Sequence, residues 1–319
     1  MKRLILVLAL AVLGWAGWWF WSAYTLRGTV EAWFEARQND GWVASYSDLA
    51  VRGFPNRLDL TLSELILANP HTQILWEAPF FQIMSLSYKP QHKILIFPNS
   101  QSLSMPSGDY EITSDGLRAS VVFAENGIID RLNAEAEILN WQGTALAGAT
   151  AALLRQEEAQ YQFALVADSI ANADTSQTPL AKGRINDARL NTTVTFDKDW
   201  AAAALTQSRP QPVHIDVTLM SYLLESLQLD MAGAVSVDAS GRASGDLTLR
   251  AVNWQQALEQ SRAGSQLATG ITEKLVQGLS IVAGLKGRPD TLDLPLTLDS
   301  GQISLGLIPL GPAPRLQIP

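Results

Sequence analysis

The sequence predicts a mainly β protein of the α+β class. We expect an N-terminal transmembrane helix, then a large curved antiparallel sheet with a long C-terminal amphipathic helix packed on it. Residues 4–26 carry no charged side chain, and from Trp42 to about Phe196 apolar and polar residues alternate in short runs. Alternation with a period of two indicates half-buried strands. Closely spaced strands of this kind indicate an antiparallel meander rather than βαβ units.

Residues 1–26 are predicted to form a transmembrane anchor. As a helix, the run from Leu4 to Leu26 would extend about 34 Å, which exceeds the roughly 30 Å hydrocarbon core of a bilayer. Lys2 and Arg3 precede this run. Its second half is crowded with aromatic residues, which we expect to anchor it in the membrane: Trp15, Trp18, Trp19, Trp21 and Tyr24.

Basic residues stay on the cytoplasmic side of a membrane, whereas Trp and Tyr favour the headgroup layer. We therefore expect a single-pass inner-membrane protein with a cytoplasmic N-terminus and a periplasmic C-terminal domain. A cleaved signal peptide is the competing interpretation, because such peptides also have a basic start and an apolar centre. Ser22-Ala23 is a weak cleavage candidate among bulky residues.

The rest of the chain divides into a short helix and a long β-rich part. Residues 27–41 are predicted to continue the membrane helix outward and to end at Gly41, since glycine commonly stops a helix. Residues 42–319 form the expected periplasmic β-rich domain. Residues 139–142 and 252–255 are similar, which would fit two similar halves, near 42–170 and 185–319, but four residues are too few to define a repeat, and coincidence is the favoured interpretation.

Several turns and helices can be placed within the β-rich part. Residues 74–88 read as a long strand interrupted at Pro79, where an edge or a bulge is expected. Turn residues at 114–116, 125–127 and 239–241 predict hairpins, and residues 292–307 predict a last hairpin before an irregular Pro-rich tail. Helical segments are expected at 200–207, at 222–229 and, as the long amphipathic helix, at 254–282.

Composition excludes several classes of function. The net charge of −8 argues against nucleic acid, which requires clustered Lys and Arg. The absence of cysteine excludes disulfides, thiol catalysis and thiolate metal sites. His71, His92 and His214 are far apart in the sequence, and neither a nucleophile elbow nor a phosphate loop is present. We therefore expect a protein that is not an enzyme and that has no cofactor and no metal site.

One basic motif near the membrane exit has two interpretations. Arg52 and Arg57 flank the sequence Gly53-Phe54-Pro55. The simpler interpretation is a turn between two strands, because Gly allows unusual φ angles and a residue before Pro is held extended. The functional interpretation is a basic pair that binds the phosphate of a lipid headgroup.

Several phrases, in the order in which they occur, resemble one family. They are Gly41-Trp42, Arg52-Gly53-Phe54-Pro55-Asn56-Arg57, Trp76-Glu77-Ala78-Pro79, Phe97-Pro98, Gly301-Gln302-Ile303-Ser304-Leu305-Gly306 and Pro309-Leu310-Gly311-Pro312-Ala313-Pro314. Together with the anchor, they resemble the bacterial domain-of-unknown-function 2125 family. The resemblance implies an envelope protein of Gram-negative, mainly alphaproteobacterial, cells, and it supplies no catalytic residues. A single anchor before a long β-rich part is also similar, more distantly, to AsmA-like envelope proteins.

Two functions of different classes follow from this pattern. The first is a non-enzymatic envelope protein that binds or guides a hydrophobic ligand, a membrane lipid, in a groove of the sheet. The second is an envelope scaffold that binds another protein and has no ligand. An open apolar groove would favour the first, and a closed core with a flat exposed patch would favour the second.

Overall fold

The protein is one long helix followed by antiparallel strands. The computed structural model describes residues 1–141, 143–172, 187–201, 209–224, 227–254, 291–306 and 308–318. The chain forms two compact units, Met1–Ala145 and Leu146–Pro319, and each is described by itself. The units divide before residues 170–185, where the sequence suggested a boundary. Whether the two parts are similar to each other stays a prediction.

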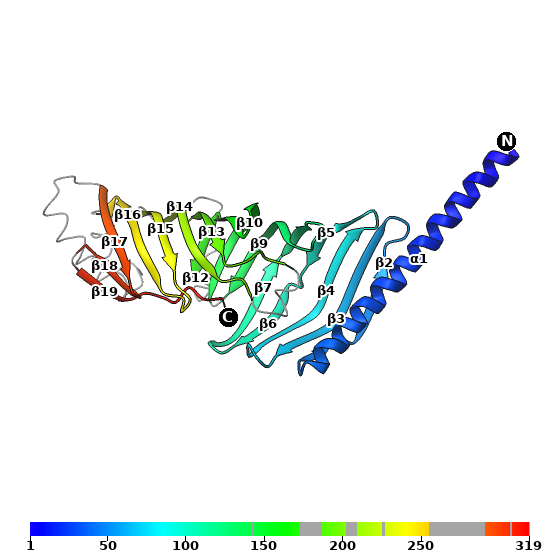
Figure 1. The fold of residues 1–319 in the computed structure, drawn as a ribbon, viewed down its shortest axis with the longest axis horizontal. Helices are drawn as coiled ribbons and strands as arrows, with labels where there is room; N and C mark the ends of the chain where they lie inside the picture. The colour runs from blue at the N-terminus through cyan, green and yellow to red at the C-terminus, as the bar shows by residue number, and fades with distance from the viewer. Residues whose placement is uncertain are drawn as a thin grey trace. The chain divides into compact units, whose positions relative to one another are not determined.

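The first unit holds the helix and the first strands (Figure 1). Its elements are α1 (Lys2–Asn39), β1 (Val43–Ser45), β2 (Asp48–Arg52), β3 (Arg57–Asn69), β4 (Ile74–Leu86), β5 (Lys89–Ile96), β6 (Ser100–Met105), β7 (Gly108–Asp115), β8 (Arg118–Phe123) and β9 (Ile129–Trp141). The predicted anchor and juxtamembrane helix are thus one unbroken helix. Gly41, with a φ of +84°, follows its end as expected.

The C-terminal half of α1 packs on the first strands. Phe34, which is 4% exposed, lies in a core cluster with leucines from β2 and β3, among them Leu49 and Leu62. At the end of the helix, the Arg37 guanidinium lies 5.9 Å from the ring centroids of both Trp33 and Trp42. Burial of aromatic and leucine side chains contributes about 1.5–3 kcal/mol per side chain. The C-terminal half of α1 is therefore a structural part of the first unit.

The strands of the first unit form a meander whose later strands are broken in the middle. β5 and β6 both pair with β4, and β7 and β8 both pair with β9. Ser114 to Gly116, predicted as a hairpin turn, is instead a bend between two pieces that run in the same direction. Gly116 has a φ of +65°. The backbone N–H of the buried Ser114 donates a hydrogen bond of 2.8 Å to the carbonyl of Asn99, the residue that precedes β6.

The edge or bulge expected at Pro79 is instead one unpaired position within the continuous strand β4, and the register of the β3–β4 ladder does not shift there. The pairs Ser63–Phe80 and Leu65–Ala78 flank a gap at Glu64 and Pro79, and Glu64 adopts a φ of +48°. The irregular residue reverses the alternation, so Leu62 and Leu65 both join the core cluster beneath α1. The hairpin predicted at residues 125–127 is confirmed between β8 and β9, where Gly127 has a φ of +78°.

The second unit continues as an antiparallel meander. Its strands are β10 (Thr144–Glu157), which begins at the boundary, β11 (Gln160–Ala167), β12 (Ser169–Asn172), β13 (Ala188–Phe196), β14 (Pro212–Leu224), β15 (Leu227–Val237), β16 (Ala243–Val252), β17 (Thr291–Asp299), β18 (Gln302–Leu305) and β19 (Ile308–Pro312). The hairpins predicted around residues 239–241 and 292–307 are confirmed. The tail predicted to be irregular contributes one more strand, β19, paired with β18.

Two of the expected helices are outside the described residues. The amphipathic helix expected at 254–282 falls almost wholly on residues 255–290, and the one expected at 200–207 falls on residues 202–208. The helical turns expected at 222–229 are wrong, because Tyr222 pairs with Leu229 across the β14–β15 hairpin. Alternating apolar residues on both arms of that hairpin outweigh the local helical spacing.

The second unit contains a partly buried cluster of hydrogen-bonded residues around Asp199. Arg155 donates two hydrogen bonds of 2.8 Å to the Asp199 carboxylate, which also accepts from the Tyr161 hydroxyl at 3.0 Å and from the Ala159 N–H at 2.9 Å. The Arg155 hydrogen bonds lower the pKa of Asp199 below its ordinary value of 3.8. Burial, above all, raises the pKa of Tyr161 to about 12.

Asp199→Asn is therefore expected to lower the free energy of unfolding by about 2 kcal/mol at neutral pH, because it leaves part-buried donors without a charged acceptor. Since the folded pKa is the lower one, this stabilisation is present in full above pH 3.8 and is lost as the pH falls through the folded pKa. Thermal unfolding of the full chain in detergent, read by Trp fluorescence, measures both effects. Glu135→Gln, in an exposed pair with Arg118, is the control and should cost less than about 1 kcal/mol. An equal loss in both variants would contradict a special role of Asp199.

Candidate membrane-proximal lipid site

The basic motif Arg52 to Arg57 forms the turn between β2 and β3, and this turn lies against the apolar part of α1. The Trp15 indole Nε1–H donates to the Pro55 carbonyl at 3.0 Å, and the Trp19 Nε1–H donates to the Arg57 carbonyl at 2.7 Å. Trp19 is 5% exposed, and its hydrogen bond to Arg57 is part-buried. The motif is therefore a turn that packs on α1.

Aromatic rings complete this contact. The Phe54 ring stacks on Phe20 at a centroid distance of 5.8 Å and meets Trp19 edge to face at 5.5 Å. Phe54 still exposes 51% of its surface.

Gly53 is required at this turn. Its φ is +106°, and a Cβ built on it would lie 2.7 Å from the Arg57 Cβ. The Phe54–Pro55 peptide bond is cis. Arg57 pairs with Asp59 at 2.9 Å, while Arg52 is exposed at the end of β2.

The other predicted anchor residues lie along the same helix. Trp18 contacts Trp15 at a ring distance of 5.0 Å, and Trp21 and Tyr24 are 65% and 79% exposed. The sequence did not indicate that Trp15 and Trp19 bind the turn. Their spacing of four residues, which places them on one helical face, was the available signal.

The face of the sheet that α1 covers continues beyond the helix. The cluster around Phe34 extends as far as Phe81 and Ile83 on β4. Residues paired across strands share a face, and the pairing carries this face from Ile83 to Leu95, from Trp76 to Leu103 and onward to β9. The half-buried and buried apolar residues there, which we call the apolar face, are Leu95, Leu103, Ile112, Ala119, Val121 and Leu132.

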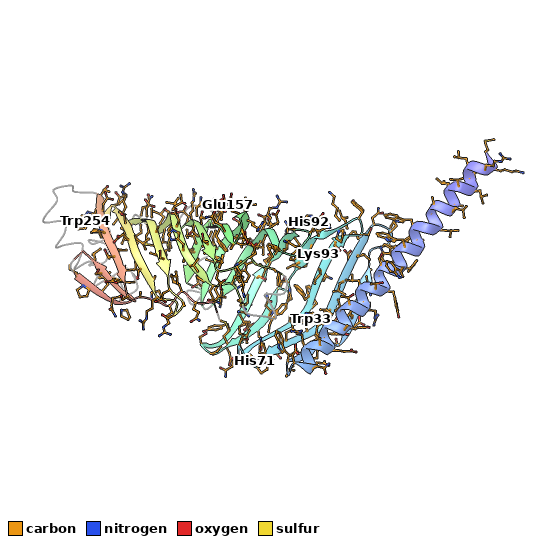
Figure 2. All side chains as sticks on the ribbon, in the orientation of Figure 1. Trp33, His71, His92, Lys93, Glu157 and Trp254 are labelled. Carbon is orange, nitrogen blue, oxygen red and sulfur yellow. The ribbon has the colours of Figure 1, made fainter. Side chains whose placement is uncertain are left out.

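Lys93, labelled in Figure 2, lies on the apolar face. It is near the end of that face that adjoins the β2–β3 turn, because its neighbour Ser85 pairs with Leu58. Its Nζ donates to the Ser85 hydroxyl at 3.4 Å, and Val121 is its partner across β8. Burial lowers the pKa of the Lys93 ammonium below its ordinary value. In the described part of the chain, no carboxylate forms an ion pair with it. Lys93 could not be singled out from the sequence, because only the strand register shows that it shares a face with leucines.

The opposite face of the first unit is polar where it is hollowed. A shallow hollow of about 400 Å³ lies beside Glu64 and Pro79. Glu77 and Glu111, which line it, accept hydrogen bonds from Ser102 and Ser100. Its carboxylates suit neither an acyl chain nor an anionic headgroup.

The three histidines are on different elements. His71 lies in the β3–β4 turn, His92 contacts Ser120 with Nε2···Oγ at 2.8 Å, and His214 contacts Ser236 with Nδ1···Oγ at 3.5 Å. Among the described residues, no group of His, Asp and Glu side chains could hold a metal ion.

The chain belongs to a family of uncharacterized proteins conserved in bacteria, DUF2125, whose model matches residues 19–314. No curated protein and no solved structure matches it. The more distant likeness to AsmA-like proteins therefore stays a prediction. Among the described residues, α1 is the one helix long and apolar enough to cross a membrane.

Trp19→Phe is expected to destabilise the first unit by about 1–3 kcal/mol, because it leaves the part-buried Arg57 carbonyl without its donor. Trp21→Phe is the matched control, since Trp21 is largely exposed and should change stability by less than about 0.5 kcal/mol. Thermal unfolding of the full chain in detergent compares the two. Equal melting temperatures for both variants would contradict the role of the Trp19 contact.

Proposed function

We propose that this protein is a non-enzymatic, inner-membrane protein that binds or guides a membrane lipid on the apolar face of its first unit, in the maintenance of the cell envelope. The observation that carries the proposal is the continuity of that face with the anchor helix. Leu95, Leu103 and Leu132 extend the surface that α1 covers, and they are only half-buried. Apolar side chains left in contact with water favour an apolar occupant.

An acyl chain fits this surface and is available at the membrane. Each methylene that leaves water contributes about 0.8 kcal/mol, so partial burial of one chain supplies several kcal/mol. The anchor brings the sheet to the source of such chains. In this proposal α1 crosses the inner membrane once, with Lys2 and Arg3 in the cytoplasm and the sheet in the periplasm.

Lys93 favours a phospholipid over an uncharged lipid. A half-buried ammonium without a carboxylate partner is costly, and a phosphate beside it offsets that cost. Ser85, 3.4 Å from the Lys93 Nζ, adds a hydroxyl for the same headgroup. The apolar face would then hold the acyl chains of the lipid whose phosphate Lys93 binds.

The proposal predicts that phospholipid remains bound to the full chain purified from native membranes in mild detergent. Lys93→Gln should lower the bound phospholipid roughly tenfold, because it removes one charge-assisted contact of about 1.4 kcal/mol or more. His92→Gln is the matched control: it is the neighbouring residue on the same strand, faces the opposite side, and should retain as much lipid as the unchanged chain. Quantitative lipid mass spectrometry gives the amounts.

Two results would count against the proposal. Absence of stoichiometric lipid from the unchanged chain would contradict lipid binding and favour the scaffold that binds another envelope protein. Equal phospholipid in the Lys93→Gln and His92→Gln variants would contradict the headgroup role of Lys93 while leaving the apolar face in place.

A further inference from the structure

We infer that the β2–β3 turn is itself inserted into the membrane leaflet on the side of the sheet, where Phe54 contacts acyl chains. The inference rests on the anchoring part of the proposed function, namely that α1 crosses the bilayer. It follows from where along α1 the turn is bound. Figure 1 shows β2 and β3 alongside the helix, which continues past them to the N-terminus.

The free part of α1 is too short to span the membrane alone. The hydrocarbon core is about 30 Å thick, and a helix advances about 1.5 Å per residue. From Leu4, the first apolar residue after the basic pair, to Trp15 the helix covers about 16 Å. Trp15 and the Pro55 carbonyl bound to it would therefore lie about 14 Å below the far boundary of the core.

Trp15 remains below the boundary of the hydrocarbon core after either of the two adjustments that a helix can make. Tilting shortens the vertical rise of each residue, so a tilted helix places Trp15 deeper below the boundary. Lys2 and Arg3 can lie within the core and extend their charges to the headgroups, which moves the start of the count to Lys2. Trp15 then still lies about 10 Å below the boundary.

Most backbone carbonyls of the turn are paired within the protein. Four of the five carbonyls from Gly53 to Arg57 accept hydrogen bonds within the protein. Gly53 accepts from the Arg57 N–H at 2.8 Å, Pro55 from Trp15, Asn56 from the Ser87 N–H at 2.9 Å, and Arg57 from Trp19. Pro55 has no N–H to satisfy. Hydrocarbon requires such internal pairing of backbone groups, whereas a turn in water does not.

The side chains of the turn match the same placement. Phe54 is half-exposed at the tip, and Tyr88, in the adjoining turn, is 57% exposed. Arg52 and Arg57 are long enough to extend their guanidinium groups to the headgroup layer. β5 then leads roughly 13 Å from the Tyr88 turn to Lys93, toward the level of the phosphates.

Depth measurements on the full chain test this inference directly, because it contains no cysteine. Single cysteines are introduced as Phe54→Cys, Asn56→Cys, Leu8→Cys and His71→Cys, labelled with the fluorophore NBD and reconstituted in phosphatidylethanolamine–phosphatidylglycerol vesicles. Leu8 reports the anchor. His71 reports the opposite end of β3, about 40 Å from the turn for its 13 residues (Figure 2). Asn56→Cys keeps the Phe54 ring stack intact.

Labels at positions 54, 56 and 8 should lose emission to nitroxide-bearing lipids and resist iodide in the water, and the label at 71 should behave in the opposite way. If position 8 is lipid-quenched but 54 and 56 are quenched by iodide, the turn is outside the membrane and the inference is overturned, while the anchor stands. If position 8 is also quenched by iodide, the anchoring part of the proposed function fails with it.

Discussion

In the proposed function, two indole hydrogen bonds determine where the first strands sit relative to the membrane. Trp15 and Trp19 donate to the Pro55 and Arg57 carbonyls, so the β2–β3 turn is held on the apolar part of α1 rather than beyond it. A sheet joined to its anchor by a loose linker would sample many heights above the bilayer. Here the turn and the helix form one packed body, and the depth of the helix sets the height of the first strands.

That constraint gives the apolar face its functional meaning. Leu95, Leu103 and Leu132 line a surface that begins under α1, and Lys93 adds a cation toward the end of that surface nearest the β2–β3 turn. Apolar residues on a domain far from lipid would favour a protein partner equally well. Because the same helix that covers this face also carries the candidate anchor, a lipid can reach the surface without crossing water.

The fold class and much of the strand pattern could be predicted from the sequence, and so could the Arg52–Arg57 motif, whereas the apolar face and Lys93 could not. The alternation of apolar and polar residues predicted β3, and the Asn126-Gly127 pair predicted the β8–β9 turn. Gly116 was misread as a hairpin turn, because a positive φ bends a strand or reverses it depending on pairing that the local sequence does not contain. The position of Lys93 on the apolar face could not be predicted for the same reason, because its neighbours Ser85 and Val121 lie on other strands.

The central claim is that lipid occupies one face of the first unit and not the other. A photoreactive benzoylphenylalanine placed at Leu95 or at Ile94 tests it most directly, since these neighbours on β5 face opposite sides. On irradiation of living cells, the account predicts phospholipid crosslinked to position 95 and little to position 94. Equal crosslinking at both positions, or crosslinks at 95 to protein alone, would contradict it.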